Sequence, residues 1–299
     1  MEPNTLEITE QPEGLRFASI RDLVNRTLNQ NFGTKTTPEG VSTGFKELDR
    51  TLGGFQKGQV YTIAVKPGMG KTAFLLSLAN NMAIKENYTV AIFSSERSNI
   101  KMTNRLIESE TGMSLDKLQS GALKDSEKDH IFSLLNRIAK AKIYIDDTPA
   151  LSLEDFSEKI RKFRGLYHVD LVIIDYLELL TTGIPEPEER PEQLGRIVEN
   201  IRSIARELDL PVLLFSQSAG YTNGYSAPGR PPLNALPGFL QDHSDVLMLL
   251  HRNDVYTINK TDRSRHAVEL VVGKKDAADT ELVIPLSFIE SIAKFTDFS

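Results

Sequence analysis

A short glycine-containing loop between a predicted strand and a predicted helix constrains this chain more than any other feature. Residues 60–65 read VYTIAV, the next seven read KPGMGKT, and residues 73–79 read AFLLSLA. Small residues let backbone N–H groups surround phosphate oxygens, a lysine reaches the terminal phosphates, and a hydroxyl ligates Mg²⁺. The positive end of the following helix also favours an anion. The sequence predicts a loop that binds ATP with Mg²⁺, made of Lys66, Pro67, Gly68, Met69, Gly70, Lys71, Thr72 and Ala73.

One position of this loop departs from the usual pattern, which begins with a glycine where this chain has Val65. A GKT tripeptide is common by chance, so a surface turn with a lysine is the alternative interpretation. That alternative does not explain why a nearly continuous apolar run leads straight into the loop. We therefore expect Lys71 to act in catalysis and Thr72 to ligate Mg²⁺.

Apolar runs alternate with helical patterns along residues 41–299, which predicts one large α/β domain. Continuous apolar strands between helices are typical of a mostly parallel sheet with helices on both faces. Residues 267–272 and 280–286 have β composition and predict an antiparallel hairpin at one edge. The predicted strands are residues 60–65, 89–93, 143–145, 170–174, 211–215 and 246–248, and the predicted helices begin near residues 73, 101, 126, 153 and 192.

Residues 1–40 are predicted to form a separate leader with one amphipathic helix. Residues 1–15 are polar and contain prolines and a glycine, and residues 33–40 have the composition of a linker. Between them, five apolar residues fall on one helical face: Phe17, Ile20, Leu23, Val24 and Leu28. An exposed apolar stripe must be covered. The helix at residues 17–28 therefore docks either on its own domain or on a neighbouring subunit.

Three polar residues follow predicted strands: Glu96, Asp175 and Gln217. Because parallel-sheet enzymes bind ligands at the carboxyl ends of their strands, we expect these side chains to converge with Lys71. Asp175 would hold the water shell of Mg²⁺, Glu96 would act as the general base on the attacking water, and Gln217 would sense the γ-phosphate. The alternatives are a helix-capping role for Glu96 and a loop-anchoring hydrogen bond for Gln217.

Composition excludes several other classes of protein. The chain has no cysteine, so disulfides, thiolate zinc sites and cysteine nucleophiles are excluded. No apolar run approaches the roughly 20 residues that span a bilayer, and the first residues lack a secretory signal, so we expect a cytoplasmic protein. Proteins that coat DNA are usually basic. With a net charge of −6, any nucleic-acid contact must be local, in a groove or pore.

Several sequence blocks resemble the carboxyl-terminal ATPase domain of DnaB-type replicative helicases, and the likeness covers roughly residues 17 to 295. The resemblance implies a RecA-like fold, hexameric rings and ATP-driven movement on single-stranded DNA. It also implies that the helix at residues 17–28 docks on the next subunit, that Glu96 is the catalytic base, and that Arg105 packs on the nucleotide base. The matching blocks are residues 42–49 (STGFKELD), 66–73 (KPGMGKTA), 144–149 (YIDDTP), 174–177 (IDYL) and 215–217 (FSQ).

The chain also departs from the family pattern. The family's amino-terminal domain is not matched. Before the turn of the edge hairpin, the family carries a lysine and an arginine that reach the neighbouring ATP site, whereas this chain reads Lys274, Lys275 and Asp276. An arginine finger contributes several orders of magnitude to turnover, and lysine lacks its planar fork. We therefore expect a weakened contribution from the neighbouring subunit.

The segments expected to contact DNA are altered as well. Residues 234–238 keep only the final glycine of the family's DNA-binding loop, and residues 181–191 are rich in glutamate. Nearby, Tyr221, Tyr225 and Arg230 are candidates to stack on or pair with a single strand. A mobile polar loop is the alternative interpretation of that segment.

Three functions are therefore weighed. The first is a DnaB-like DNA helicase or translocase that acts on single-stranded DNA as a ring. The second is a helicase paralogue that binds or hydrolyses ATP but has lost translocation and serves as an assembly or regulatory module. The third is a different RecA-like ATPase, such as a recombination mediator or a clock-type ATPase, which the specific family blocks disfavour.

Overall fold

The computed structural model describes residues 40–119, 125–182, 189–217, 229–252, 267–274 and 281–298. The chain divides into two units, residues 1–37 and 38–299, and all described residues belong to the second unit. The predicted leader and its helix at residues 17–28 lie outside the described residues. So do Tyr221, Tyr225, Lys275 and Asp276. The domain boundary at residue 40 stays a prediction.

Among the described residues, nine strands form one sheet in the order β3-β2-β4-β5-β1-β6-β7-β8-β9. The pairs from β3 to β6 are parallel, and the pairs from β6 to β9 are antiparallel. This confirms the predicted parallel sheet with an antiparallel edge, although β9 was not predicted. The strands are β1 (Val60–Val65), β2 (Val90–Ser94), β3 (Ile143–Asp146), β4 (Leu171–Asp175), β5 (Val212–Ser216), β6 (Val246–Arg252), β7 (Ala267–Lys274), β8 (Glu281–Ile289) and β9 (Lys294–Asp297).

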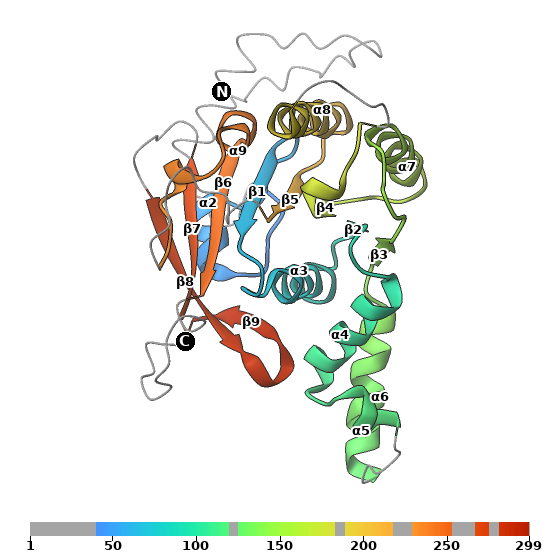
Figure 1. Ribbon diagram of the computed structural model, residues 1–299. Coiled ribbons are helices and arrows are strands. Elements are labelled where there is room, and N and C mark those ends of the chain that lie inside the picture. The colour runs from blue at the N-terminus through green and yellow to red at the C-terminus, as the bar shows by residue number, and fades with distance from the viewer. Residues whose placement is uncertain are drawn as a thin grey trace, which may run out of the picture. The chain divides into compact units, whose positions relative to one another are not determined.

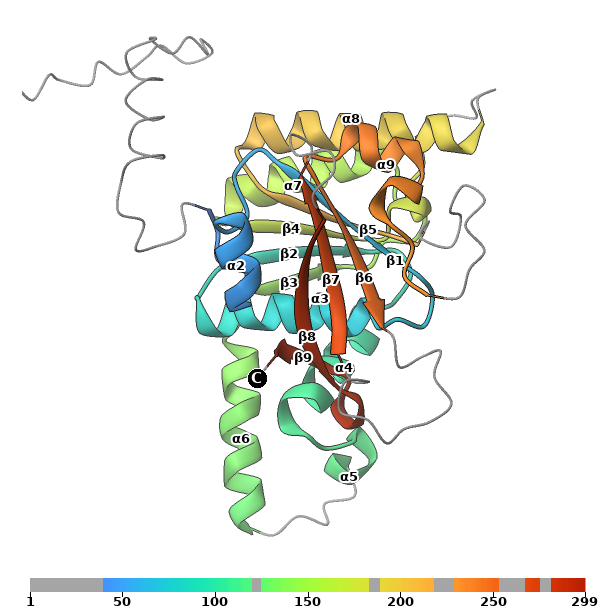
Figure 2. The same cartoon turned by 90° about the vertical axis from the view of Figure 1, so that its left-hand side faces the viewer.

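Helices cover both faces of the sheet, as predicted (Figure 1). The helices α2, α3 and α4 share one hydrophobic cluster, and α7, α8 and α9 share the other. Figure 2 shows α4, α5 and α6 extending away from the sheet below α3. The helices are α2 (Lys46–Leu52), α3 (Lys71–Asn80, continued by a π-helical turn Asn81–Lys85), α4 (Asn99–Thr111), α5 (Leu115–Gln119), α6 (Asp125–Ala139), α7 (Leu153–Leu166), α8 (Arg190–Leu208) and α9 (Gly238–His243).

The central strands are apolar throughout because they are buried on both faces. Every residue of β1 is buried, and alternate side chains enter opposite clusters: Tyr61, Ile63 and Val65 face α3, whereas Val60 and Ala64 face α8. The loop that follows Val65 therefore begins from a rigid strand.

Helix α3 is buried along its whole length. Phe74 lies between two other rings, with its centroid 5.5 Å from that of Phe45 and 5.5 Å from that of Phe295 on β9. Aromatic pairs at this separation add to the hydrophobic stabilisation of a core. Because α3 is held on several sides, its amino terminus has a fixed position at the carboxyl edge of the sheet.

Candidate nucleotide site

The loop from Lys66 to Gly70 turns the chain from β1 into α3 with glycines in the left-handed region. Gly68 has φ 84° and Gly70 has φ 95°, a conformation that other residues rarely adopt. A Cβ at Gly70 would also lie 3.0 Å from the ring of Phe295. Pro67 and Gly68 are exposed, whereas Met69 is buried. The loop therefore presents mainly backbone to solvent.

The amino terminus of α3 is suited to hold an anion. Lys71, Thr72 and Ala73 begin the helix, and their N–H groups have no acceptor within it. The capping position, Gly70, supplies no side-chain hydrogen bond. The helix dipole adds positive potential at the same point. These residues fit a phosphate chain, as the sequence predicts.

Met69 shapes the loop from the inside, and its predicted contact with the nucleotide stays a prediction. Its side chain is packed in the hydrophobic cluster, and its N–H donates to the carbonyl of Lys66 at 3.2 Å. In this conformation Met69 holds the shape of the loop, because both its side chain and its N–H are already engaged.

The ammonium of Lys71 lies between two carboxylates from neighbouring strands. Its Nζ is 2.6 Å from Oδ1 of Asp175 at the end of β4, and it also contacts Oε2 of Glu96, which follows β2. It lies 3.9 Å from the ring centroid of Tyr176. The side chain of Asp175 is 0% exposed, that of Lys71 is 9% exposed and that of Glu96 is 29% exposed. Three predicted site residues therefore converge on one point.

Burial dominates the electrostatics of Asp175. It raises the pKa of the carboxyl above the usual 3.8, and the nearby charge of Lys71 partly opposes this rise. Oδ2 accepts a hydrogen bond from Ser94 at 3.3 Å, because Ser94 and Asp175 are paired across β2 and β4. A buried carboxylate that is only partly compensated is costly to the unliganded fold and is typical of a functional site.

The residues present fit a magnesium ion. Among the described residues, no group of three or more histidine, aspartate or glutamate side chains could hold a metal by itself. Mg²⁺ is usually bound by one or two protein ligands together with phosphate oxygens and water. Asp175 and the buried Thr72 provide that kind of partial ligand set. Their roles as metal ligands stay predictions.

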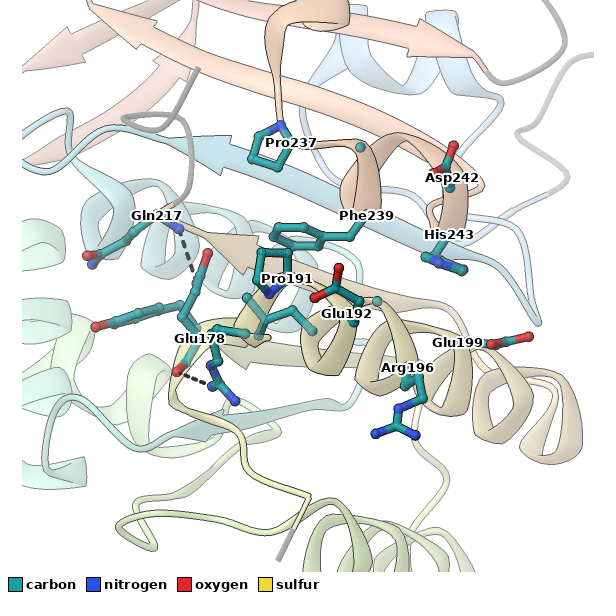
Figure 3. Close-up of a pocket in the computed structure, with 15 residues that line it drawn as sticks. Glu178, Pro191, Glu192, Arg196, Glu199, Gln217, Pro237, Phe239, Asp242 and His243 are labelled. Atoms are coloured by element: carbon teal, nitrogen blue, oxygen red, sulfur yellow. Dashed lines mark hydrogen bonds between the residues drawn. The ribbon is translucent and has the colours of Figure 1, made fainter. Parts of the chain in front are cut away.

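Gln217 lies one residue beyond β5 and lines a cavity of about 1000 Å³ between α8 and α9. Tyr176 lines the same cavity and also contacts Lys71, so the cavity lies next to the cluster of Lys71, Glu96 and Asp175. Figure 3 shows Gln217 next to Glu178, whose Oε2 accepts the Gln217 N–H at 3.3 Å. Glu178 was missed by sequence reasoning. Its only signal was that it lies three residues after Asp175.

Two other predicted residues lie apart from this cluster. Arg105 is exposed on α4, and its predicted contact with the nucleotide base stays a prediction. The suggestion that Arg230 pairs with a DNA strand is not supported. Its guanidinium is 3.0 Å from Glu269 and 2.8 Å from Glu281, so two carboxylates already neutralise its charge.

Replacing Asp175 with asparagine is expected to stabilise the ligand-free protein. The pKa of Asp175 is raised in the folded state. The free energy that this carboxyl contributes to folding is therefore fully present below its pKa in the unfolded chain, and it is lost as pH rises through its pKa in the folded protein. Asparagine has no charge to bury. We therefore expect the thermal midpoint of Asp175→Asn to exceed that of the unmodified protein near neutral pH, with a difference that shrinks on acidification.

The measurement is thermal unfolding followed by circular dichroism across this pH range. Asp129→Asn removes an exposed carboxylate from α6 and is the matched control for the change of aspartate to asparagine. A midpoint for Asp175→Asn that is lower than that of the unmodified protein near neutral pH would contradict the assignment of burial as the dominant effect.

Comparisons with known proteins identify the family to which this fold and this site correspond. The family described as DnaB-like helicase C terminal domain matches residues 40–297. The replicative DNA helicase DnaB of Geobacillus stearothermophilus is 30% identical over 300 residues, which cover 98% of this chain and 64% of that protein. The DnaB of Treponema pallidum is 32% identical over 278 residues, which cover 92% and 60%. The chain thus spans less than two thirds of the length of these relatives.

Two solved structures of related proteins have a similar fold. The ATPase domain of G40P is 26% identical with a TM-score of 0.80, over 95% of this chain and 100% of that one. A DnaB-like replicative helicase, described together with its interactions with primase, is 26% identical with a TM-score of 0.78, over 95% and 68%. Within the described residues, no helix has the length and apolar character to cross a membrane. The match from residue 40 to 297, together with the RecA-like architecture, shows that this chain belongs to the DnaB-like helicase C-terminal domain family.

Proposed function

We propose that this chain is the ATP-hydrolysing motor of a DnaB-like replicative DNA helicase, acting in the cytoplasm as a ring on single-stranded DNA. The observation that carries this proposal is the convergence of Lys71, Glu96 and Asp175 beside the amino terminus of α3. The names of the relatives, which are replicative DNA helicases, support the helicase assignment.

In this proposal, the N–H groups at the start of α3 bind the phosphates of ATP, and Lys71 neutralises the charge on the terminal phosphate. Glu96 is the most exposed member of the charged cluster, and it accepts the proton of the attacking water. Thr72 and Asp175 hold Mg²⁺, which when bound neutralises phosphate charge and orients the chain of phosphates. Gln217 senses the γ-phosphate from the end of β5, and Arg105 packs on the base.

The ring, in this proposal a hexamer, is formed through the helix at residues 17–28, which docks on the next subunit. Exposed apolar side chains on the extension formed by α4, α5 and α6 support this step. Phe132 on α6 is 63% exposed and Ile100 on α4 is 68% exposed. An apolar stripe on the helix and apolar side chains on the extension need covering for the same reason.

A second candidate function is a paralogue that binds and hydrolyses ATP without translocation and serves as an assembly or regulatory module. Two observations favour it. Aspartate occupies position 276, where the resemblance to the family implies an arginine that reaches the neighbouring site. Arg230 is paired with Glu269 and Glu281 and therefore offers no free charge to DNA phosphates.

The test of the proposed function is ATP hydrolysis by the purified chain with and without single-stranded DNA, at low and moderate salt, combined with solution mass measurement. We expect DNA to stimulate turnover, with a stimulation that weakens as salt rises. We also expect an assembly of about six times the 33.4 kDa mass of one chain. Equal rates with and without DNA at every salt concentration would contradict a translocase, whereas unwinding of a duplex would exclude the paralogue.

A further inference from the structure

Strand β4 ends at Asp175, and strand β5 leads to Gln217. The two strands do not pair with each other at these residues. The pairing of β4 with β5 runs from Val172 opposite Val212 to Ile174 opposite Leu214. Beyond that point β5 continues along β1, where Ser216 is opposite Ala64. The two strand ends therefore need another connection if Asp175 and Gln217 are to keep a fixed separation.

Glu178 provides this connection. It lies in the 3₁₀ turn Leu177–Leu179, directly after Asp175 and Tyr176. Its carboxylate accepts a hydrogen bond from Oγ of Ser216 at 2.5 Å and another from the N–H of Gln217 at 3.3 Å. Hydrogen bonds to an ionised carboxylate are stronger than those between neutral groups. One side chain thus bridges the gap that the β-ladder leaves open.

The turn that carries Glu178 is held from its other side by the first residue of α8. Arg190 donates to the carbonyl oxygens of Glu178 and Leu180, at 2.9 Å in each case. Figure 3 shows Glu178 beside Gln217, with a dashed line between them for the hydrogen bond from the Gln217 N–H. The backbone of Glu178 is therefore fixed to α8 while its carboxylate is fixed to β5.

We propose that Glu178 is a positioning residue that holds Gln217 at the distance from Asp175 that ATP hydrolysis requires; this inference rests on the proposed function of the site. A carboxylate suits this position because Ser216 and the Gln217 N–H both donate to it, each to a different oxygen. Glu178 acts through Gln217 and does not itself touch the nucleotide.

Glu178→Ala is expected to lower kcat for ATP roughly 10- to 100-fold, because small displacements of a catalytic group have effects of this size. The affinity for a non-hydrolysable ATP analogue should stay within about twofold, since the loop and α3 are unchanged. Glu178→Gln keeps an oxygen that can accept the Gln217 N–H, and its amide N–H can donate to Oγ of Ser216, because a hydroxyl both donates and accepts; this variant should recover most of the lost rate. Glu192→Ala removes an exposed carboxylate from α8 in the same cavity and is the matched control.

A double-mutant cycle distinguishes positioning of Gln217 from a general structural role. If Glu178 acts through Gln217, then Glu178→Ala should reduce kcat little further in a Gln217→Ala background. Rate losses that multiply independently would overturn the proposal, because they would place the effect of Glu178 elsewhere.

Hydrogen exchange at the backbone N–H of Gln217 tests the clamp without relying on turnover. We expect faster exchange in Glu178→Ala, with Glu178→Gln and Glu192→Ala close to the unmodified protein. Unchanged exchange in Glu178→Ala would overturn the inference even if the protein hydrolyses ATP. Faster exchange in a protein that does not hydrolyse ATP would instead place the failure in the proposed function.

Discussion

Lys71→Ala is expected to reduce ATP turnover by on the order of 10³-fold or more, because the variant loses the charge aimed at the terminal phosphate. The ammonium of Lys71 is nearly buried between Glu96 and Asp175, so solvent screens it only weakly. The measurement is steady-state phosphate release at saturating ATP and Mg²⁺.

Folding is the main confounding effect, because removing Lys71 leaves the buried Asp175 without its cation. Lys71→Arg keeps the positive charge but not the compact geometry of the ammonium, and it should also lose most turnover while remaining folded. Lys162→Ala removes an exposed lysine from α7 and is the matched control, with unchanged turnover. Turnover by Lys71→Ala within twofold of the unmodified protein would contradict the assigned role.

Glu96→Gln is expected to bind ATP normally and to hydrolyse it about 10²- to 10⁴-fold more slowly, the range over which a general base contributes. The carboxamide has nearly the same shape as the carboxylate, but it cannot accept the proton of water. Single-turnover hydrolysis and equilibrium nucleotide binding, measured on the same preparation, separate the two effects.

Glu154→Gln is the matched control for this variant, because it makes the same chemical change at an exposed position on α7. Its turnover should equal that of the unmodified protein. If Glu96→Gln hydrolyses ATP at the unmodified rate, Glu96 is not the general base, and its ion pair with Lys71 does not serve catalysis by proton transfer.

The fold could be predicted from sequence wherever a strand is buried on both faces. Residues 60–65 form a continuous apolar run because alternate side chains enter two different clusters. Strand β9 could not be predicted, because Lys294–Asp297 has only four residues and little apolar pattern. It is stabilised by distant partners: Phe295 packs on Phe74, and its N–H donates to Oγ of Ser77 at 2.9 Å.

Part of the site could likewise be predicted from the sequence, and part could not. Lys71, Glu96 and Asp175 could be placed together because parallel strands share a carboxyl edge. The register of those strands is not written in the sequence, so the hydrogen bonds of Ser94 to Asp175 and of Ser216 to Glu178 were not foreseen. For the same reason the sequence leaves two interpretations of Arg230 open, a DNA contact or part of a polar loop, since nothing local indicates that carboxylates from β7 and β8 face it.

Binding of a non-hydrolysable ATP analogue in the presence of Mg²⁺ tests the central claim most directly. Titration calorimetry with the full chain is predicted to give saturable binding of one analogue per chain that depends on Mg²⁺ and is lost in Lys71→Ala. Absence of saturable binding, or equal binding by Lys71→Ala and the unmodified protein, would contradict the claim that the loop from Lys66 to Thr72 holds a nucleoside triphosphate.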